Sequence, residues 1–451
     1  MRTTTLPHCH HVIIASLSAI LACASVVAAQ ATEDLYLIDA NLVDPTARQV
    51  HRGNLLIRDG IIVATPQRPP ADFAGRTLDL DGKWVIPGLG DLHTHTFGNA
   101  DPAGRPIDRP EPAGVAQRML YAGVTAFLDL FGDQDLLFET REQQRAGETG
   151  GADMFASLSC ITAPGGHGTE YGVEAHTVSS PEEARRAVED LKRRHADVIK
   201  IIYGLGAGRP SIDRATLFAT IAAARANGLK TVVHVEGWQL VRDAVEAGAT
   251  AVTHVPGGAI PEDLPRLMVA RNVASIPTLT VHTDFPDFVN EAAVLDNPMA
   301  RALTTPAVIA AYRSADVSAL VAKRQPEFEA NTAGILRSVK AMADAGVTIL
   351  AGTDSGSPGT LQGYSVHREL IKLVEAGLSS WQALAAATTE AGAFLGRAYG
   401  VTPGSEANLV VLDASPIDDI RNTQRIAYVI HHGAIVDREA VLESELAGLR
   451  R

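Results

Sequence analysis

Between residues 86 and 400, short apolar runs alternate with longer amphipathic stretches, and this alternation limits the possible fold more than any other feature of the chain. Such alternation is typical of parallel strands that are joined by helices. The strand-length runs lie near residues 88–95, 124–130, 153–161, 197–202, 230–235, 250–255, 273–279 and 347–354. Eight strand–helix units fit a closed barrel of parallel strands with an outer ring of helices.

The amphipathic stretches between these runs are expected to be helices. They include residues 180–195, 212–227, 239–247, 262–271 and 324–345. The first of them begins with Ser180 and Pro181, a capping serine before a proline at the first helical position. A doubly wound open sheet is the alternative fold for the same alternation. We favour the barrel because no glycine-rich phosphate loop follows the first strand.

Short strands are also expected at both ends of the chain. They lie near residues 35–38, 54–57, 61–63, 408–412 and 427–430, and turn pairs such as Asp59-Gly60 separate the early ones. The sequence therefore predicts an α/β chain. It consists of a (β/α)8 TIM barrel at residues 86–400 and a small β-sandwich domain that residues 32–85 and 401–451 form together.

Three polar side chains interrupt the apolar runs in a way that points to chemistry. His93 and His95 end the first run, and residues two apart in a strand point to the same face. Two imidazoles that converge at the carboxyl end of a strand can bind one metal ion. Lys200 lies in the middle of the fourth run, where an unpaired ammonium is costly to bury. We expect it to face outward, to be paired, or to be carboxylated by carbon dioxide to an anionic carbamate.

Three further ligand-type residues follow the same rule. His234 and His254 lie near the carboxyl ends of the fifth and sixth runs, and Asp354 ends the eighth. Active sites of barrel enzymes lie at this end of the strands. Each residue alone has an ordinary structural explanation, but all of them together indicate a metal centre.

In this order of ligands the chain resembles the amidohydrolase superfamily in its binuclear-metal subtype. The segments 85–89 and 403–410 are similar to the points where chains of that family enter and leave the barrel, although the family more often has Lys-Ala-Asp in the second segment. The resemblance implies that His93, His95 and Asp354 hold a first metal ion, and that His234 and His254 hold a second. Carboxylated Lys200 would bridge the two ions, which are expected to be zinc from their ligand types.

The resemblance also implies an activity. Two ions would lower the pKa of a shared water to give hydroxide, and Asp354 would pass its proton to the leaving nitrogen. We expect hydrolysis of an amide or peptide bond, as in a dipeptide or an N-acyl amino acid. Hydrolysis of a cyclic amide, a lactone or an ester, or one-metal deamination, stays an alternative. A non-catalytic binding protein is disfavoured because none of the six ligands is missing.

Substrate contacts are expected from the loops that follow the strands. A glycine-rich loop at residues 165–171 holds His167 and Tyr171, and resembles the branch that contains imidazolonepropionase-like enzymes and metal-dependent dipeptidases. The resemblance to that branch implies that Tyr203, three residues after Lys200, binds a substrate carboxylate, and Arg209 could do the same through two parallel hydrogen bonds. His282 follows the seventh run and is a further candidate.

The charge of the chain bounds its partners. A formal net charge of −13 argues against nucleic acid, because phosphate binding needs clustered Lys and Arg. A small-molecule substrate is expected, and a homo-oligomer stays open.

Residues 12–29 are apolar, follow the single charged residue Arg2, and end in small residues, which is the pattern of a secretory signal peptide. We predict export to the periplasm or medium, cleavage after Ala29 or Ala31, and no membrane insertion of the mature chain, with lipid attachment at Cys23 as the alternative. Cys160 is then the single cysteine of the mature chain, and is expected to be buried. N-terminal sequencing of the exported protein should begin near Gln30 or Thr32, and a full-length chain in the cytoplasm would refute the leader.

Overall fold

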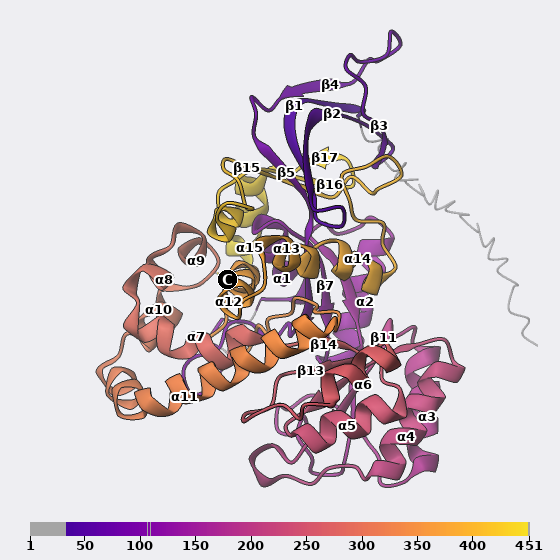
Figure 1. Cartoon of the computed structure of the whole chain (residues 1–451), viewed down its shortest axis with the longest axis vertical. Coiled ribbons are helices and arrows are strands. Elements are labelled where there is room, and N and C mark those ends of the chain that lie inside the picture. The colour runs from indigo at the N-terminus through magenta and orange to yellow at the C-terminus, as the bar shows by residue number, and fades with distance from the viewer. Residues whose placement is uncertain (1–32, 106, 109, 450–451) are drawn as a thin grey trace, which may run out of the picture. The chain divides into compact units, whose positions relative to one another are not determined.

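The computed structural model describes residues 33–105, 107–108 and 110–449 (Figure 1). The expected leader lies outside these residues, so export stays a prediction. The chain from Thr32 to Arg451 clusters as one compact unit. The expected boundaries at residues 85/86 and 400/401 stay predictions. Among the described residues, no helix is long and apolar enough to cross a membrane.

Parallel strands with intervening helices form the middle of the chain, as the sequence predicts. One parallel sheet contains β6 (Leu89–Thr94), β7 (Val124–Asp129) and β8 (Asp153–Ala156). A second has the order β10 (His176–Thr177), β9 (Cys160–Thr162), β11 (Val198–Tyr203), β12 (Lys230–Val235), β13 (Ala251–Thr253) and β14 (Ala274–Ile276). Each apolar run up to residue 276 therefore contains a strand.

Backbone hydrogen bonds connect the two sheets at both of their edges. The run 153–161 is divided at Leu158, whose φ is +65°, and Asp197 N then donates to Ala156 O at 2.9 Å. The eighth run is not a regular strand, but Leu350 N donates to Ser275 O and Leu92 N to Ala351 O, both at 2.9 Å. These bonds place the eighth run between β14 and β6, in the order expected of a barrel.

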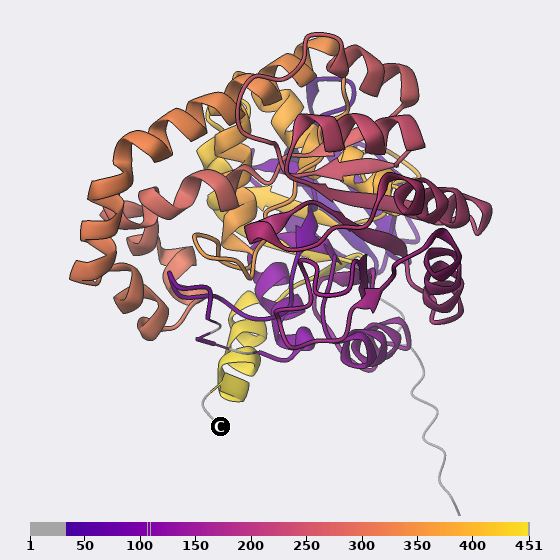
Figure 2. The same cartoon turned by 90° about the horizontal axis from the view of Figure 1, so that it is seen from below.

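Helices surround the strands, which Figure 2 shows from below. They are α1 (Pro112–Tyr121), α2 (Gln134–Arg145), α3 (Pro181–Arg193), α4 (Arg214–Ala226), α5 (Trp238–Ala247), α6 (Leu264–Arg271), α11 (Ala315–Ala345), α12 (Tyr364–Glu375), α13 (Ser380–Ala387) and α14 (Thr389–Leu395). The expected serine cap of α3 is confirmed, because Glu183 N donates to Ser180 Oγ at 3.3 Å.

The sequence did not predict the helices that follow β14. The seventh run was expected to stay extended to residue 279, but α7 (Leu279–Asn290) begins there. It is followed by the short helices α8 (Ala292–Asp296), α9 (Pro298–Ala302) and α10 (Pro306–Tyr312). Helix α11 also begins nine residues before the expected 324, and continues through Pro326.

The strands near the two ends of the chain join in one mixed sheet. Its order is β17 (Ala434–Ile435), β16 (Ile426–His431), β15 (Leu409–Leu412), β5 (Trp84–Pro87), β1 (Leu35–Asp44), β2 (Gln49–Arg58) and β3 (Ile61–Ala64), and β4 (Arg76–Asp79) also pairs with β1. Both ends thus contribute to one β unit, as expected, but its strands are hydrogen-bonded as a single sheet and not as the two sheets of a sandwich. Helix α15 (Arg438–Leu449) follows it.

Alternation along each parallel strand divides the core into an inner and an outer part. The inner cluster is buried between the strands and contains Leu92, Leu128, Val198, Val232, Ala251, Ile276 and Leu350. Residues of opposite parity, such as Ile199, Ile201 and Val233, join the larger cluster beneath the helices. Cys160 is buried and unpaired, which confirms its expected burial.

A buried ion pair fixes α2 against the start of β11. Arg141 has a fully buried side chain, and its Nη1 donates to Asp197 Oδ2 at 2.8 Å. The same carboxylate accepts from Arg145 Nη2 at 2.8 Å and from Ala156 N at 2.9 Å. Removal of the carboxylate would leave the buried Arg141 guanidinium with Glu142 Oε1, 3.2 Å from its Nε, as its remaining counter-ion.

We expect Asp197→Ala to lower the free energy of unfolding by about 3–5 kcal/mol, because it breaks a buried pair from one side. Urea denaturation measures the change. The control is Glu182→Ala, which removes a carboxylate whose side chain is 74% exposed and pairs only with Arg185, and should change stability by less than about 0.5 kcal/mol. Equal effects of the two substitutions would contradict the assignment of Asp197 as a structural anchor.

Candidate metal centre

A cavity of about 1250 Å³ lies at the carboxyl ends of the parallel strands. Five of the six expected ligands come from β6, β11, β12 and the residues directly after β6 and β13, and the sixth is Asp354 from the eighth run. All six line the cavity, namely His93, His95, Lys200, His234, His254 and Asp354. The structure therefore brings together every residue that the sequence singled out as a metal ligand.

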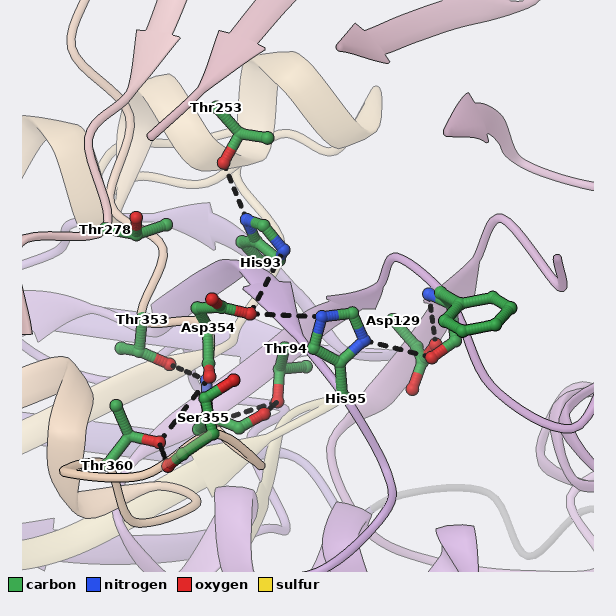
Figure 3. Close-up of polar contacts among 12 residues, drawn as sticks. His93, Thr94, His95, Asp129, Thr253, Thr278, Thr353, Asp354, Ser355 and Thr360 are labelled. Carbon is green, nitrogen blue, oxygen red and sulfur yellow. Dashed lines mark hydrogen bonds and ion pairs between the residues drawn. The ribbon is translucent and has the colours of Figure 1, made fainter. Parts of the chain in front are cut away.

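Asp354 lies between the first two histidines, as Figure 3 shows. Its Oδ1 is 3.0 Å from His95 Nε2 and 3.4 Å from His93 Nε2. Two imidazole nitrogens and one carboxylate oxygen within 4.8 Å of one another are a donor set that fits a divalent ion. Burial alone would raise the pKa of Asp354, but the neighbouring His93 and His95 hold it well below its ordinary value. The carboxylate is therefore ionised at neutral pH.

Hydrogen bonds at Nδ1 hold three of the four imidazoles in place. His93 Nδ1 lies 2.6 Å from Thr253 Oγ1, and His95 Nδ1 donates to Phe131 O at 2.9 Å (Figure 3). His254 Nδ1 lies 2.8 Å from Thr278 Oγ1. Outer partners of this kind fix the orientation of metal-binding histidines.

The protonation state of three of the four histidines, His93, His234 and His254, suits metal binding, whereas the nearby Asp354 raises the pKa of His95. Burial lowers the pKa of His93 and His254 well below the ordinary value. Burial lowers the pKa of His234 to about 4. The three imidazoles are therefore neutral at pH 7, which is the form that binds a metal ion.

Lys200 faces the cavity and not the helices. Its side chain is almost fully buried, and Nζ lies 3.2 Å from His93 Nε2. Burial lowers the pKa of Lys200 to about 8, so about a tenth of the amine is neutral at pH 7, far more than for an exposed lysine. His234 and His254 lie beside it with ring centroids 4.5 Å apart.

The backbone is strained where the ligands attach. His254 and Asp354 have φ of +72° and +57°, and Thr278, which supports His254, has φ of +48°. Non-glycine residues seldom adopt this left-handed conformation, and a β-branched residue such as threonine does so least readily. Strain of this kind clusters at functional sites, where it places side chains that regular strands could not.

Asp91 was missed by the sequence analysis and holds the eighth run against β6. Its carboxylate accepts from Thr353 Oγ1 at 2.6 Å, from Thr353 N at 3.0 Å and from His93 N at 3.2 Å. Burial raises the pKa of Asp91 to about 7. A carboxylate inside an apolar run, two residues before His93, was the signal that could have identified it.

Three of the five expected substrate residues line the cavity. They are His167, Tyr171 and His282. Tyr203 does not: its hydroxyl donates to Asp243 Oδ2 at 2.9 Å behind the strand. The expectation for Tyr203 is wrong because a residue three positions after Lys200 points to the opposite face of β11.

Arg209 is also absent from the cavity lining, and its Nε lies 3.4 Å from Glu170 Oε1. Neither Tyr203 nor Arg209 is therefore placed to bind a substrate carboxylate in the cavity. Glu170 and Glu236 line the cavity instead, and the sequence analysis missed both. Glu236 follows His234 by two positions, so the parity of the strand could have found it.

A model of the amidohydrolase family matches residues 84–436, and the chain belongs to this family. The family resemblance expected from the ligand order is thus confirmed. Members are hydrolases and generally depend on metal ions.

Two curated relatives cover most of the chain. An uncharacterized protein of Mycobacterium tuberculosis is 25% identical over 399 residues, which cover 85% of this chain and 90% of that protein. Ochratoxinase of Aspergillus niger is 24% identical over 455 residues, which cover 88% of this chain and 84% of that enzyme.

Solved structures share the fold. A Xaa-Pro dipeptidase with bound methionine superposes with a TM-score of 0.71 at 23% identity, and covers 89% of this chain and 99% of its own. The structure of A. niger ochratoxinase gives a TM-score of 0.66 at 21% identity, with 90% and 96% covered. These neighbours imply a TIM-barrel fold, in agreement with the parallel strands and surrounding helices.

Proposed function

We propose that the protein is a binuclear metal-dependent hydrolase that cleaves an amide bond in a small substrate. The observation that carries the proposal is the convergence of His93, His95 and Asp354 with Lys200 at the carboxyl ends of the strands. His93, His95 and Asp354 would hold one ion, and His234 and His254 a second. The cleavage of amides by a dipeptidase of the same fold supports the choice of bond.

Carboxylation of Lys200 is part of the proposal. A neutral ε-amine attacks carbon dioxide, one N–C bond forms, and one proton is released, which leaves an anionic carbamate. The low pKa of Lys200 supplies the neutral amine, and burial protects the product. A carbamate offers two oxygens, so it can bridge two ions, whereas the ammonium would repel them.

The remaining side chains have roles that follow from their positions. When bound, the two ions would acidify water and polarise the scissile carbonyl. Asp354 is ionised and is placed to accept the proton of the attacking water and return it to the leaving nitrogen. Thr253 and Thr278 keep His93 and His254 oriented through their Nδ1 atoms.

The charged lining of the cavity favours a particular substrate. Apart from the ligands, the charged residues that line it are Glu111, Asp133, Glu170, Glu236 and Arg105. Arg105 Nη2 is paired with Asp101 Oδ2 at 2.7 Å, so acidic groups dominate. The hydrogen bond to His234 lowers the pKa of Glu236, which is therefore ionised. We propose that the substrate carries a cationic group and that Glu236 binds it. This proposal replaces the expected binding of a substrate carboxylate by Tyr203 or Arg209.

Removal of the bridging group tests the metal centre. Lys200→Ala should lose most bound metal and about 100-fold or more in kcat/KM, while circular dichroism shows an intact fold, because outer partners and ligands affect metal affinity strongly. Wild-type protein should carry about two Zn²⁺ in the cavity by elemental analysis, in addition to any ion bound outside it. Short carboxylic acids should partly restore the activity of Lys200→Ala, and Lys200→Arg should stay inactive because it keeps its positive charge.

Lys230→Ala is the matched control, since Lys230 lies on the neighbouring strand and its Nζ donates to Phe394 O away from the cavity. It should retain the metal content of wild type. A stoichiometry near one ion in wild type would favour the one-metal class of deaminases. Two ions retained in Lys200→Ala would contradict the bridge.

A second experiment tests the substrate. With N-acyl amino acids and dipeptides that carry Lys, Leu or Glu side chains, wild type should prefer the cationic series. Glu236→Gln should lower kcat/KM for the cationic series about tenfold and change the neutral series little, since a charge-assisted hydrogen bond contributes about 1.5–3 kcal/mol. Glu111→Gln is the control at the same cavity, and should lower the preference less than Glu236→Gln does, because Glu111 is exposed to solvent. An equal loss on all series would refute the role of Glu236.

A further inference from the structure

A second group of metal-ligating side chains lies outside the cavity. It consists of Asp153, His431 and His432, and none of the three lines the cavity. Asp153 is the first residue of β8, so it lies at the amino end of the parallel strands, away from the catalytic ligands. The two histidines lie at the end of β16 and in the turn to β17. The group therefore joins the middle of the chain to the terminal sheet.

The ligand atoms of this group converge on one carboxylate oxygen. Asp153 Oδ1 lies 2.8 Å from His432 Nε2 and 3.5 Å from His431 Nε2. The two imidazole rings have centroids 4.0 Å apart. All three ligand atoms lie within 4.8 Å of one another. Ligand atoms of a tetrahedral zinc ion are about 3.3 Å apart, so small adjustments would bring this group to that geometry.

The backbone turns the two histidines to the same side. Successive residues of a strand point to opposite faces, so two adjacent histidines would ordinarily diverge. His432 instead has φ of +50° and Gly433 has φ of +80°, in a two-residue turn where His431 pairs with Ala434. Asn-Gly is the usual choice for such a turn, and a positive φ is uncommon for any residue other than glycine. His432, which adopts this uncommon conformation, is the residue that completes the group.

Polar atoms of the group lack hydrogen-bond partners among the described residues. His431 Nε2 is buried without a hydrogen bond, and the side chain of His431 is 10% exposed. Asp153 Oδ2 also makes no hydrogen bond, although Arg397 Nη2 lies 3.1 Å away. Arg397 is itself neutralised by Glu406 at 2.6 Å. Both atoms face the group, and a cation bound there would satisfy the buried imidazole nitrogen and the carboxylate oxygen together.

We propose that Asp153, His431 and His432 bind a divalent transition-metal ion, best matched by Zn²⁺, that cross-links β8 to the β16–β17 turn. Two imidazoles and one carboxylate suit zinc, and a water molecule completes four ligands. The ion would stabilise the contact of the terminal sheet with the amino ends of the parallel strands. It is independent of the proposed hydrolysis, which uses other residues.

Elemental analysis of the full chain after equilibration with Zn²⁺ and removal of free metal tests this site. His432→Asn removes one ligand and keeps a residue that suits the left-handed turn. Wild type should hold one ion more per chain than His432→Asn. The control is His195→Asn, because His195 is exposed and also has a left-handed φ of +60°, but belongs to no such group.

Thermal unfolding gives a second measurement. Zn²⁺ at about 100 times its dissociation constant should raise the Tm of wild type and His195→Asn by a few degrees more than that of His432→Asn or His431→Gln. Equal metal content and equal shifts in wild type and His432→Asn would overturn the proposal. A loss of one ion in His195→Asn as well would also overturn it, because binding would then be unspecific. The difference of one ion does not depend on the metals of the cavity, so failure of the proposed function would show itself separately.

Discussion

Burial of the Lys200 amine is the constraint on which the rest of the site depends. An ammonium in an apolar strand is costly, and the cost falls when the group becomes neutral or anionic. Its surroundings favour this change, since burial lowers the pKa of Lys200 and, among the described side chains, only His93 forms a hydrogen bond with Nζ. A neutral or anionic Lys200 leaves the cavity able to bind metal cations. The histidines on β6, on β12 and after β13 are neutral and are placed to bind them. Without a charge change at Lys200, the same arrangement would bring cations together.

Hydrogen bonds from residues outside the ligand set fix the positions of the proposed ligands. Thr253 and Thr278 fix two imidazoles, and Asp91 fixes the segment that bears Asp354. Asp91 lies within β6, Thr253 ends β13, and Thr278 lies two residues after β14, so the site is supported by the parallel strands and the segments that follow them. Thr278 and Asp354 have a positive φ, which such residues seldom adopt, so their side chains reach the site at a cost in backbone energy.

Strand parity predicted much of the fold and of the candidate site. Parity placed His93 and His95 on one face of their strand. The positions of His234 and His254 within their apolar runs put them at the ends of their strands. The same rule would have excluded Tyr203 and found Glu236, but a family analogy outweighed it. The eighth run could not be recognised as irregular, because its apolar residues read as a strand and its pairing depends on Asp91, which lies far away in the sequence. Helix α7 was missed because Pro286 and several β-branched residues obscure its periodicity.

The pairing of β5 with β15 has a consequence for the order of folding. Residues 84–87 lead directly into β6, the first parallel strand, and they pair with residues 409–412 near the other end of the chain. Lys83 and Asp413, which form an ion pair beside them, are 330 positions apart. Contacts of such high sequence separation form late, because loop closure costs entropy before it is rewarded. The entry to the first parallel strand therefore stays open at one edge until almost the whole chain is available, and completion of the terminal sheet is a late step in folding.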